Sequence, residues 1–295
     1  NQSARAVAVD GGRATTRPPC TSLSAFRLDD TALMASFIQT QADAYPALSE
    51  RYTGFLSLYE QKQWHQLTNQ LAAFVADETA HQGENMVMLY RNFIDEFKTR
   101  INPVSLVEFA VHASTQLFPS RPYQAAELEN AKGFLSEVLA FLEDGTTRNT
   151  LMGASAALCD HALFLCRAEL FLFDVYNETD PVAQQVLLQR LAEQGAALDE
   201  LRAPEPVVQG AHYKGAAELH RAMGNYGEFY RTGLMYLVFT PTTSSGMGWA
   251  IDLSLAALLG DGIYNFGEIL TNSVLSCLVG TDHAWLRTML EVFNS

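Results

Sequence analysis

Apolar side chains recur at intervals of three and four residues along most of this 295-residue chain. That spacing places them on one face of an α-helix, which turns once in about 3.6 residues. One such stripe consists of Met86, Leu89, Tyr90, Phe93, Ile94 and Phe97. Apolar and polar residues alternate too briefly to predict a strand, except over residues 236–240. The pattern therefore predicts an all-α protein.

Proline and glycine residues divide the chain into about ten helices joined by short turns. Pro46 separates the first two helices, and Asn102-Pro103 ends one helix and begins another, because proline fits the first turn and disfavours helix before it. A chain of short-linked helices predicts an α-solenoid of stacked helical hairpins. Trp64-x-x-Leu67 is similar to tetratricopeptide repeats, although no strict repeat of about 34 residues is present.

The last third of the chain organises the predicted fold. Two helical runs meet at Gly224-Asn225, where glycine can end a helix in a left-handed conformation, and the short turn predicts a helical hairpin. A further run, 249–259, stops at Gly260-Asp261-Gly262, and Phe266 and Leu270 then return to the core. Residues 258–270 contain no catalytic arrangement, so we interpret the segment as architectural.

The chain is acidic, with a net charge of −14 and a pI near 4.8. Its four lysines are dispersed, which argues against nucleic-acid binding through phosphate contacts and favours an assembly with basic partner surfaces. Residues 156–176 form the most apolar long run, but they carry too many charges for a membrane span. Residues 1–28 show no periodicity and are expected to be a flexible tail. Because the chain begins with Asn1, we expect a fragment, and no signal peptide is visible.

Motifs for catalysis and metal binding are weak. The nearest match to a nucleophile elbow, residues 153–157, lacks the last glycine, and the isolated Gly-x-Gly pairs favour turns. Seven histidines form neither HxH nor HExxH. Cys159, His161 and Cys166 lie on one apolar helical run, which is more typical of a core than of a metal site. Four cysteines without a CxxC pair indicate reduced thiols in a cytosolic or nuclear protein. We expect no catalytic residue, cofactor or metal.

Several blocks carry a family resemblance. They are residues 59–68, 89–97, 100–108, 224–226, 258–268, 281–286 and 293–295. Together they resemble PCI-family subunits of the 26S proteasome regulatory-particle lid, specifically the non-ATPase regulatory subunit 13 family. The likeness covers about residues 55–295, although 119–205 match only in helical character.

The resemblance implies a helical-repeat arm over residues 29–203, then the helical subdomain of a PCI domain over residues 204–295. The chain ends about where a winged helix should begin, so that part is expected to be missing. The implied function is non-catalytic scaffolding in ubiquitin-dependent protein degradation, in the cytoplasm and nucleus. Implied partners are other lid subunits, including PCI-family neighbours, the ubiquitin-removing subunit and a ubiquitin receptor, with no nucleic acid, membrane or small-molecule substrate.

Eight residues are predicted to form interfaces. Those in the segment 258–270 are Asp261, Tyr264, Asn265, Phe266 and Glu268; those near the end are Leu286, Leu290 and Phe293. We expect the first segment to be partly core and partly interface, and the last three residues to form an exposed hydrophobic face through which the chain associates or aggregates. Alternatives are a PCI-type scaffold of the COP9 signalosome or of a translation initiation complex, a nucleic-acid-binding adaptor, and an enzyme with an unrecognised site.

Overall fold

The computed structural model describes residues 23–77, 84–118, 123–145, 156–240 and 246–294, and side chains from Leu33 onward. Each regular element in these ranges is helical, which confirms the all-α prediction. The α-helices are α1 (Leu23–Ala44), α2 (Ser49–Glu60), α3 (Trp64–Val75), α4 (Asn85–Leu89), α5 (Asp95–Phe97), α6 (Pro103–Thr115), α7 (Ala125–Glu143), α9 (Ala156–Asn177), α10 (Pro181–Glu200), α11 (Pro206–Ala222), α12 (Tyr226–Phe239), α13 (Gly246–Leu259), α14 (Gly267–Thr271) and α15 (Ala284–Phe293). Short 3-10 helices span Pro46–Leu48, Lys98–Arg100 and Ser273–Leu278, and a π-helical turn spans Tyr90–Ile94.

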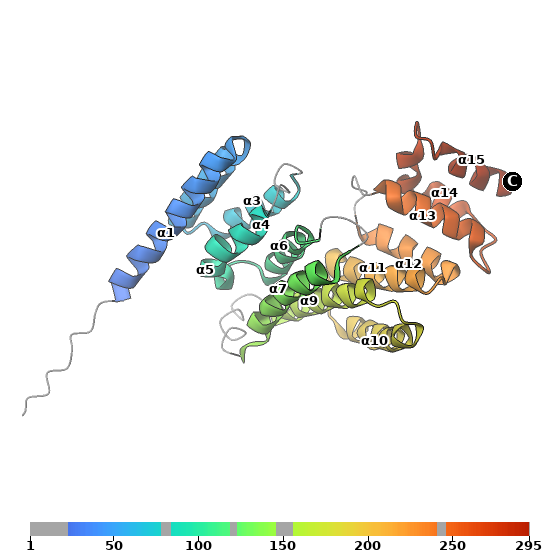
Figure 1. Ribbon diagram of the computed structural model, residues 1–295, viewed down its shortest axis with the longest axis horizontal. Helices are drawn as coiled ribbons and strands as arrows, with labels where there is room; N and C mark the ends of the chain where they lie inside the picture. The colour runs from blue at the N-terminus through green and yellow to red at the C-terminus, as the bar shows by residue number, and fades with distance from the viewer. Residues whose placement is uncertain (1–22, 78–83, 119–122, 146–155, 241–245, 295) are drawn as a thin grey trace, which may run out of the picture.

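The helices stack in chain order into an elongated solenoid (Figure 1). α1 lies at one end and α13–α15 at the other, and each layer rests on the next through the contacts α2–α3, α6–α7, α7–α9, α9–α11, α11–α12 and α12–α13. Because such contacts join elements close in sequence, the predicted stacking of neighbouring hairpins is confirmed. None of the helices described here has both the length and the apolar character needed to cross a bilayer.

The predicted helix ends follow from local chemistry. Asn102 caps α6, since its Oδ1 accepts the backbone N–H of Val104 at 2.9 Å, and Pro103 occupies the first turn. Gly224 adopts φ +73°, and the backbone N–H of Asn225 donates to the His220 carbonyl at 2.9 Å. This left-handed glycine closes α11 and lets α12 fold back on it, so the predicted hairpin is confirmed.

Two predictions about element boundaries were wrong. The possible strand at residues 236–240 is the C-terminal end of α12. α1 begins at Leu23, six residues before the expected start of the first helix at Asp29. Pro18-Pro19 is the last helix-breaking signal in that region, and the sequence after it favours helix. Residues 1–22 and the serine candidate at Ser155 lie outside the described residues.

The core of the arm is aromatic at its N-terminal end and apolar with small residues farther on. Tyr52, Phe55, Phe74 and Phe93 are almost fully buried, and their rings meet mostly edge to face. Cys166 is also buried; its thiol donates to the Leu135 carbonyl at 3.5 Å, and burial raises its pKa to about 12. Such a thiol is a packing group, and the described residues contain no cluster suited to a metal ion.

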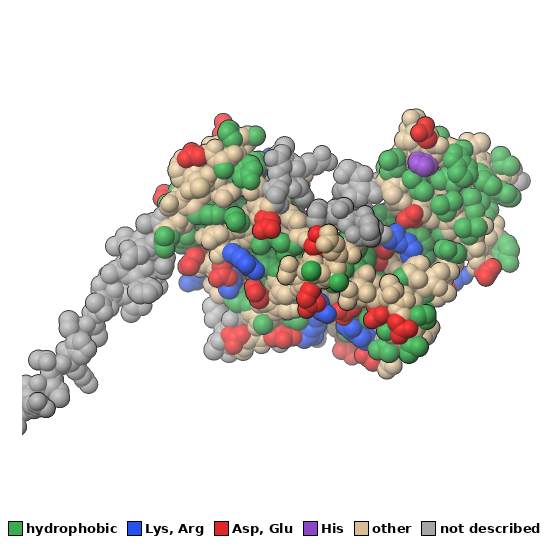
Figure 2. All heavy atoms as spheres, in the orientation of Figure 1, with side chains coloured by type: hydrophobic (Ala, Val, Ile, Leu, Met, Phe, Trp, Pro, Cys, Tyr) green, Lys and Arg blue, Asp and Glu red, His purple; other side chains and the backbone are tan. Residues whose placement is uncertain are grey.

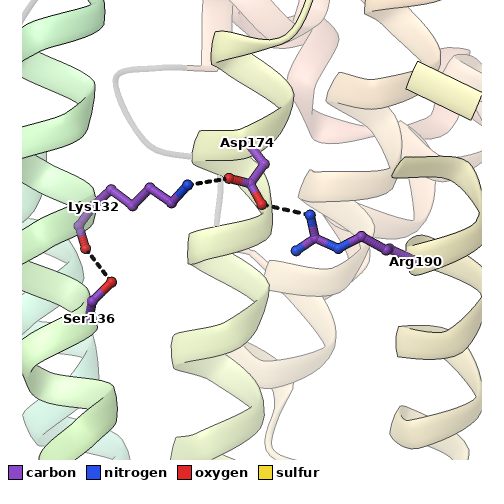
Figure 3. A network of polar contacts seen from close by, with 4 residues as sticks. All are labelled: Lys132, Ser136, Asp174 and Arg190. Carbon is purple, nitrogen blue, oxygen red and sulfur yellow. Dashed lines mark hydrogen bonds and ion pairs between the residues drawn. The ribbon is translucent and has the colours of Figure 1, made fainter. Parts of the chain in front are cut away.

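One carboxylate joins three helices of the arm (Figure 3). Asp174 on α9 accepts from Lys132 Nζ of α7 at 2.8 Å through one oxygen. Its other oxygen accepts from Arg190 Nη1 of α10 at 2.7 Å. Because Asp174 is largely shielded, with 21% of its side chain exposed, this arrangement fixes α7 and α10 on either side of α9.

Candidate interaction surface at the C-terminal end

Close backbone packing sets the geometry of the C-terminal end. At Gly233 of α12, an added Cβ would lie 2.6 Å from Leu253 Cδ2 of α13, so only glycine allows this approach. At Gly227 an added Cβ would lie 2.9 Å from the backbone oxygen of Asp261. The turn at residues 260–262 therefore rests directly on the start of α12, and Gly262 adopts φ +77° to reverse the chain.

The segment 258–270 divides into a buried and an exposed part. Phe266 is buried with 9% exposure, whereas Tyr264 exposes 89% of its surface. Asp261, Asn265 and Glu268 are also exposed. Asn265 has a local task as well, because its Oδ1 accepts the backbone N–H of Gly267 at 2.8 Å at the start of α14. The proposed interface role of these residues stays a prediction.

Leu286 and Leu290 lie in the core, each with 0% exposure. The expectation that they form an exposed face was therefore wrong. Their helix, α15, packs against α13, α14 and the 3-10 helix Ser273–Leu278, and this packing covers them. Phe293, by contrast, is 60% exposed, as expected.

The exposed face of α15 is formed by a second apolar stripe. Trp285, Met289, Val292 and Phe293 expose between 38% and 68% of their surfaces. They recur at i, i+4, i+7 and i+8, which is the spacing of one helix face. Three of them were absent from the predicted interface. An apolar stripe on each side of one helix was the signal in the sequence that could have identified them.

Exposed apolar side chains concentrate in this end of the molecule. Among the described residues, twelve of the sixteen large apolar side chains that are exposed lie at or after Tyr226. Figure 2 shows them gathered over the C-terminal end, whereas the visible charges lie mainly along the arm. We call the exposed residues Leu259, Tyr264, Val279, Trp285, Met289, Val292 and Phe293 the C-terminal apolar surface. A concentration of this kind is typical of a protein-binding surface.

Charged residues of the C-terminal helices pair with one another and hold these helices together. Arg221 of α11 bridges Glu218 at 2.7 Å and Asp252 of α13 at 2.8 Å. Burial and the nearby Glu268 carboxylate raise the pKa of Tyr230, so its hydroxyl stays neutral. On α15 itself, Arg287 pairs with Glu291 at 3.0 Å. The exposed apolar side chains of this end therefore rest on helices that ion pairs hold in place, which suits binding of another protein.

Several known proteins are similar to this chain in sequence. The chain is 32% identical over 263 residues to "26S proteasome non-ATPase regulatory subunit 13 homolog B" of Arabidopsis thaliana, covering 88% of this chain and 62% of the relative. It is 27% identical over 257 residues to "26S proteasome non-ATPase regulatory subunit 13" of Dictyostelium discoideum, covering 84% and 60%. It is 28% identical over 276 residues to "26S proteasome regulatory subunit RPN9" of Saccharomyces cerevisiae, covering 90% and 64%.

The chain thus spans between 60% and 64% of the length of these relatives. The family model described as PSD13 N-terminal repeats matches residues 51–290, which include the solenoid from α2 onward and most of α15. The chain therefore belongs to the PSD13 family, whose N-terminal repeats it carries.

Proposed function

We propose that this chain is a non-catalytic structural subunit of the regulatory-particle lid of the 26S proteasome. It scaffolds neighbouring subunits for ubiquitin-dependent protein degradation, in the cytoplasm and the nucleus. The names of its relatives support the assembly. The observation that carries the scaffolding role is the C-terminal apolar surface, which exposes seven large apolar side chains at one end of the molecule.

The architecture supports this role. A solenoid whose main contacts join helices close in sequence forms a long body with separate faces, and such a body can hold several proteins at fixed distances. We place the partners among the other lid subunits: PCI-family neighbours, the ubiquitin-removing subunit and a ubiquitin receptor. We place one contact at the C-terminal apolar surface together with Asp261, Asn265 and Glu268, and a division near residue 203 between the arm and a PCI helical subdomain.

Affinity purification from cells tests the proposal. The tagged protein is recovered from its own cells, and the co-purifying proteins are quantified by mass spectrometry. A double variant, Trp285→Gln with Val292→Gln, removes two exposed apolar side chains from the C-terminal apolar surface without adding charge. Burying an aromatic and a valine contributes about 2–4 kcal/mol, so recovery of the lid subunit at this surface should fall by more than about tenfold.

The matched control is Val182→Gln with Val186→Gln on α10, where both valines are exposed and lie far from α15 in Figure 1. This control should leave recovery unchanged. Wild-type protein that brings down no lid subunit would refute the proposal, and recovery of a different complex would transfer the scaffold role to that complex. Equal recovery of the two double variants would refute the placement of the contact.

A further inference from the structure

A groove of about 470 Å³ lies between α1 and the chain that follows α4, at the N-terminal end of the arm. Leu33 and Phe37 of α1 form one wall. Arg91, Asn92 and Glu96 form the other. The groove is separate from the C-terminal apolar surface, because α1 lies at the opposite end of the solenoid (Figure 1).

A π-helical turn shapes the second wall. The backbone N–H of Asp95 donates to the carbonyl of Tyr90, five residues earlier, instead of four. In an α-helix, residues five apart lie about 140° apart around the axis, and the extra residue of a π turn brings them much closer to one line. Arg91 and Glu96 are both exposed and line the same wall as a result. Turns of this kind are rare in proteins, and many of those known lie at functional sites.

The groove offers a positive charge, a negative charge and an apolar strip. Arg91 has a side chain 59% exposed, and the nearest carboxylate, Glu137, is 3.9 Å away. A guanidinium has five N–H donors, so most of them are available for a partner. Glu96 is exposed and forms no ion pair with a described residue. Across from them, Leu33 exposes 69% of its surface.

We propose that this groove binds an amphipathic helix of a neighbouring subunit, an inference that rests on the proposed function. The apolar stripe of the partner helix packs against Leu33 and Phe37. An acidic side chain of the partner pairs with Arg91, and a basic side chain about one turn away pairs with Glu96. A helix fits because its side chains one turn apart form a line, and because the walls offer no strand edge to extend. A second copy fits less well, since each copy carries a net charge of −14.

The first test is site-specific crosslinking inside the assembly. A photo-crosslinking amino acid replaces Leu33 in the full-length protein in its own cells, and the lid is purified and digested. The control position is Val182, which is 74% exposed on α10. Position 33 should crosslink to one helical peptide of a neighbouring subunit that carries an acidic and a basic residue three or four positions apart. Lid particles that contain the protein but show no crosslink from position 33 would overturn the inference.

The second test exchanges the positive and the negative side chain of the groove, so the amino-acid composition stays the same. The double variant Arg91→Glu with Glu96→Arg keeps the net charge but places like charges opposite both partner side chains. It should lower the crosslink from position 33 about tenfold, because each like-charge contact is unfavourable. The matched control reverses the exposed pair of Arg167 and Glu143, which are 2.8 Å apart and outside the groove, and should leave the crosslink unchanged.

The outcomes separate the two proposals. If wild-type protein recovers no lid subunit, the proposed function and the inference both fail. If lid subunits are recovered but the polarity reversal leaves the crosslink unchanged, only the inference fails. A crosslink to a second copy of this chain would also overturn it.

Discussion

Replacing Gly233 by alanine tests whether close packing of α12 on α13 holds the C-terminal end together. The added Cβ would lie 2.6 Å from Leu253 Cδ2 and 3.5 Å from Trp249 Cζ3. Leu253 is fully buried, so it cannot move into solvent to make room. We expect Gly233→Ala to destabilise the α12–α13 contact although alanine is the better helix former.

The magnitude follows from two opposing terms. Glycine to alanine in a helix interior stabilises by about 1 kcal/mol. Overpacking a filled core costs about 1–3 kcal/mol. Gly133 of α7 is the matched control, because an added Cβ there meets nothing within 4 Å. Gly133→Ala should therefore stabilise by about 1 kcal/mol, whereas Gly233→Ala should destabilise by about 0–2 kcal/mol, and the difference of about 1–3 kcal/mol is free of helix propensity.

Hydrogen exchange provides the assay, because it reports the opening free energy of each helix separately. Amides of α12 and α13 report on Gly233→Ala, and amides of α7 report on Gly133→Ala. Adding Leu253→Ala to Gly233→Ala removes the atom that clashes, so the double variant should lose about 1–2 kcal/mol less than the sum of the single variants. Equal stabilisation by both glycine replacements, or strict additivity with Leu253→Ala, would refute the reasoning.

Three further predictions concern burial and charge. Leu290→Ala should destabilise the docking of α15 by about 2–5 kcal/mol, whereas Met289→Ala on the exposed face should change the docking free energy by less than about 0.5 kcal/mol. Equal hydrogen-exchange protection of the α15 amides in both variants would contradict the assigned faces. Burial lowers the pKa of His212 below its unfolded value near 6.5, so the unfolded chain binds more protons than the folded chain. The free energy of unfolding therefore falls as the pH drops through about 6.5 towards the lowered folded pKa. His212→Asn should flatten this dependence in urea titrations between pH 5 and 8, and an unchanged slope would exclude His212 as the cause. Asp174→Asn should lower the free energy of unfolding by about 1 kcal/mol, measured with urea at low salt. Glu143→Gln, which breaks an exposed ion pair, should lower it by less than about 0.5 kcal/mol. The reverse order would show that the three-helix contact does not stabilise α10.

The fold class could be predicted from sequence because its signals are local. The apolar stripe from Met86 to Phe97 is buried at all six of its positions, as its spacing predicts. Asn102-Pro103 and Gly224 mark helix ends through their own side chains and backbone preferences, without any tertiary contact. Stacking of neighbouring hairpins follows from the short turns between them.

The surface could be predicted only in part. On α15 the pair Leu286 and Leu290 and the stripe that includes Trp285 and Val292 are both apolar, so spacing alone cannot say which of them faces the core. That choice depends on where α13 and the Ser273–Leu278 helix lie, and on which stripe they can cover.

Contacts between distant residues were decided by the tertiary structure alone. Asp174 meets Lys132, 42 residues away, and Gly233 meets Leu253 on another helix. The π turn after α4 likewise has Tyr90, Phe93 and Ile94 buried together in the core of the arm. The sequence by itself determined which segments are helical and where they end, because those properties depend on neighbouring residues. Tertiary packing decided which apolar faces stay exposed, because burial depends on the elements that the fold brings against each face.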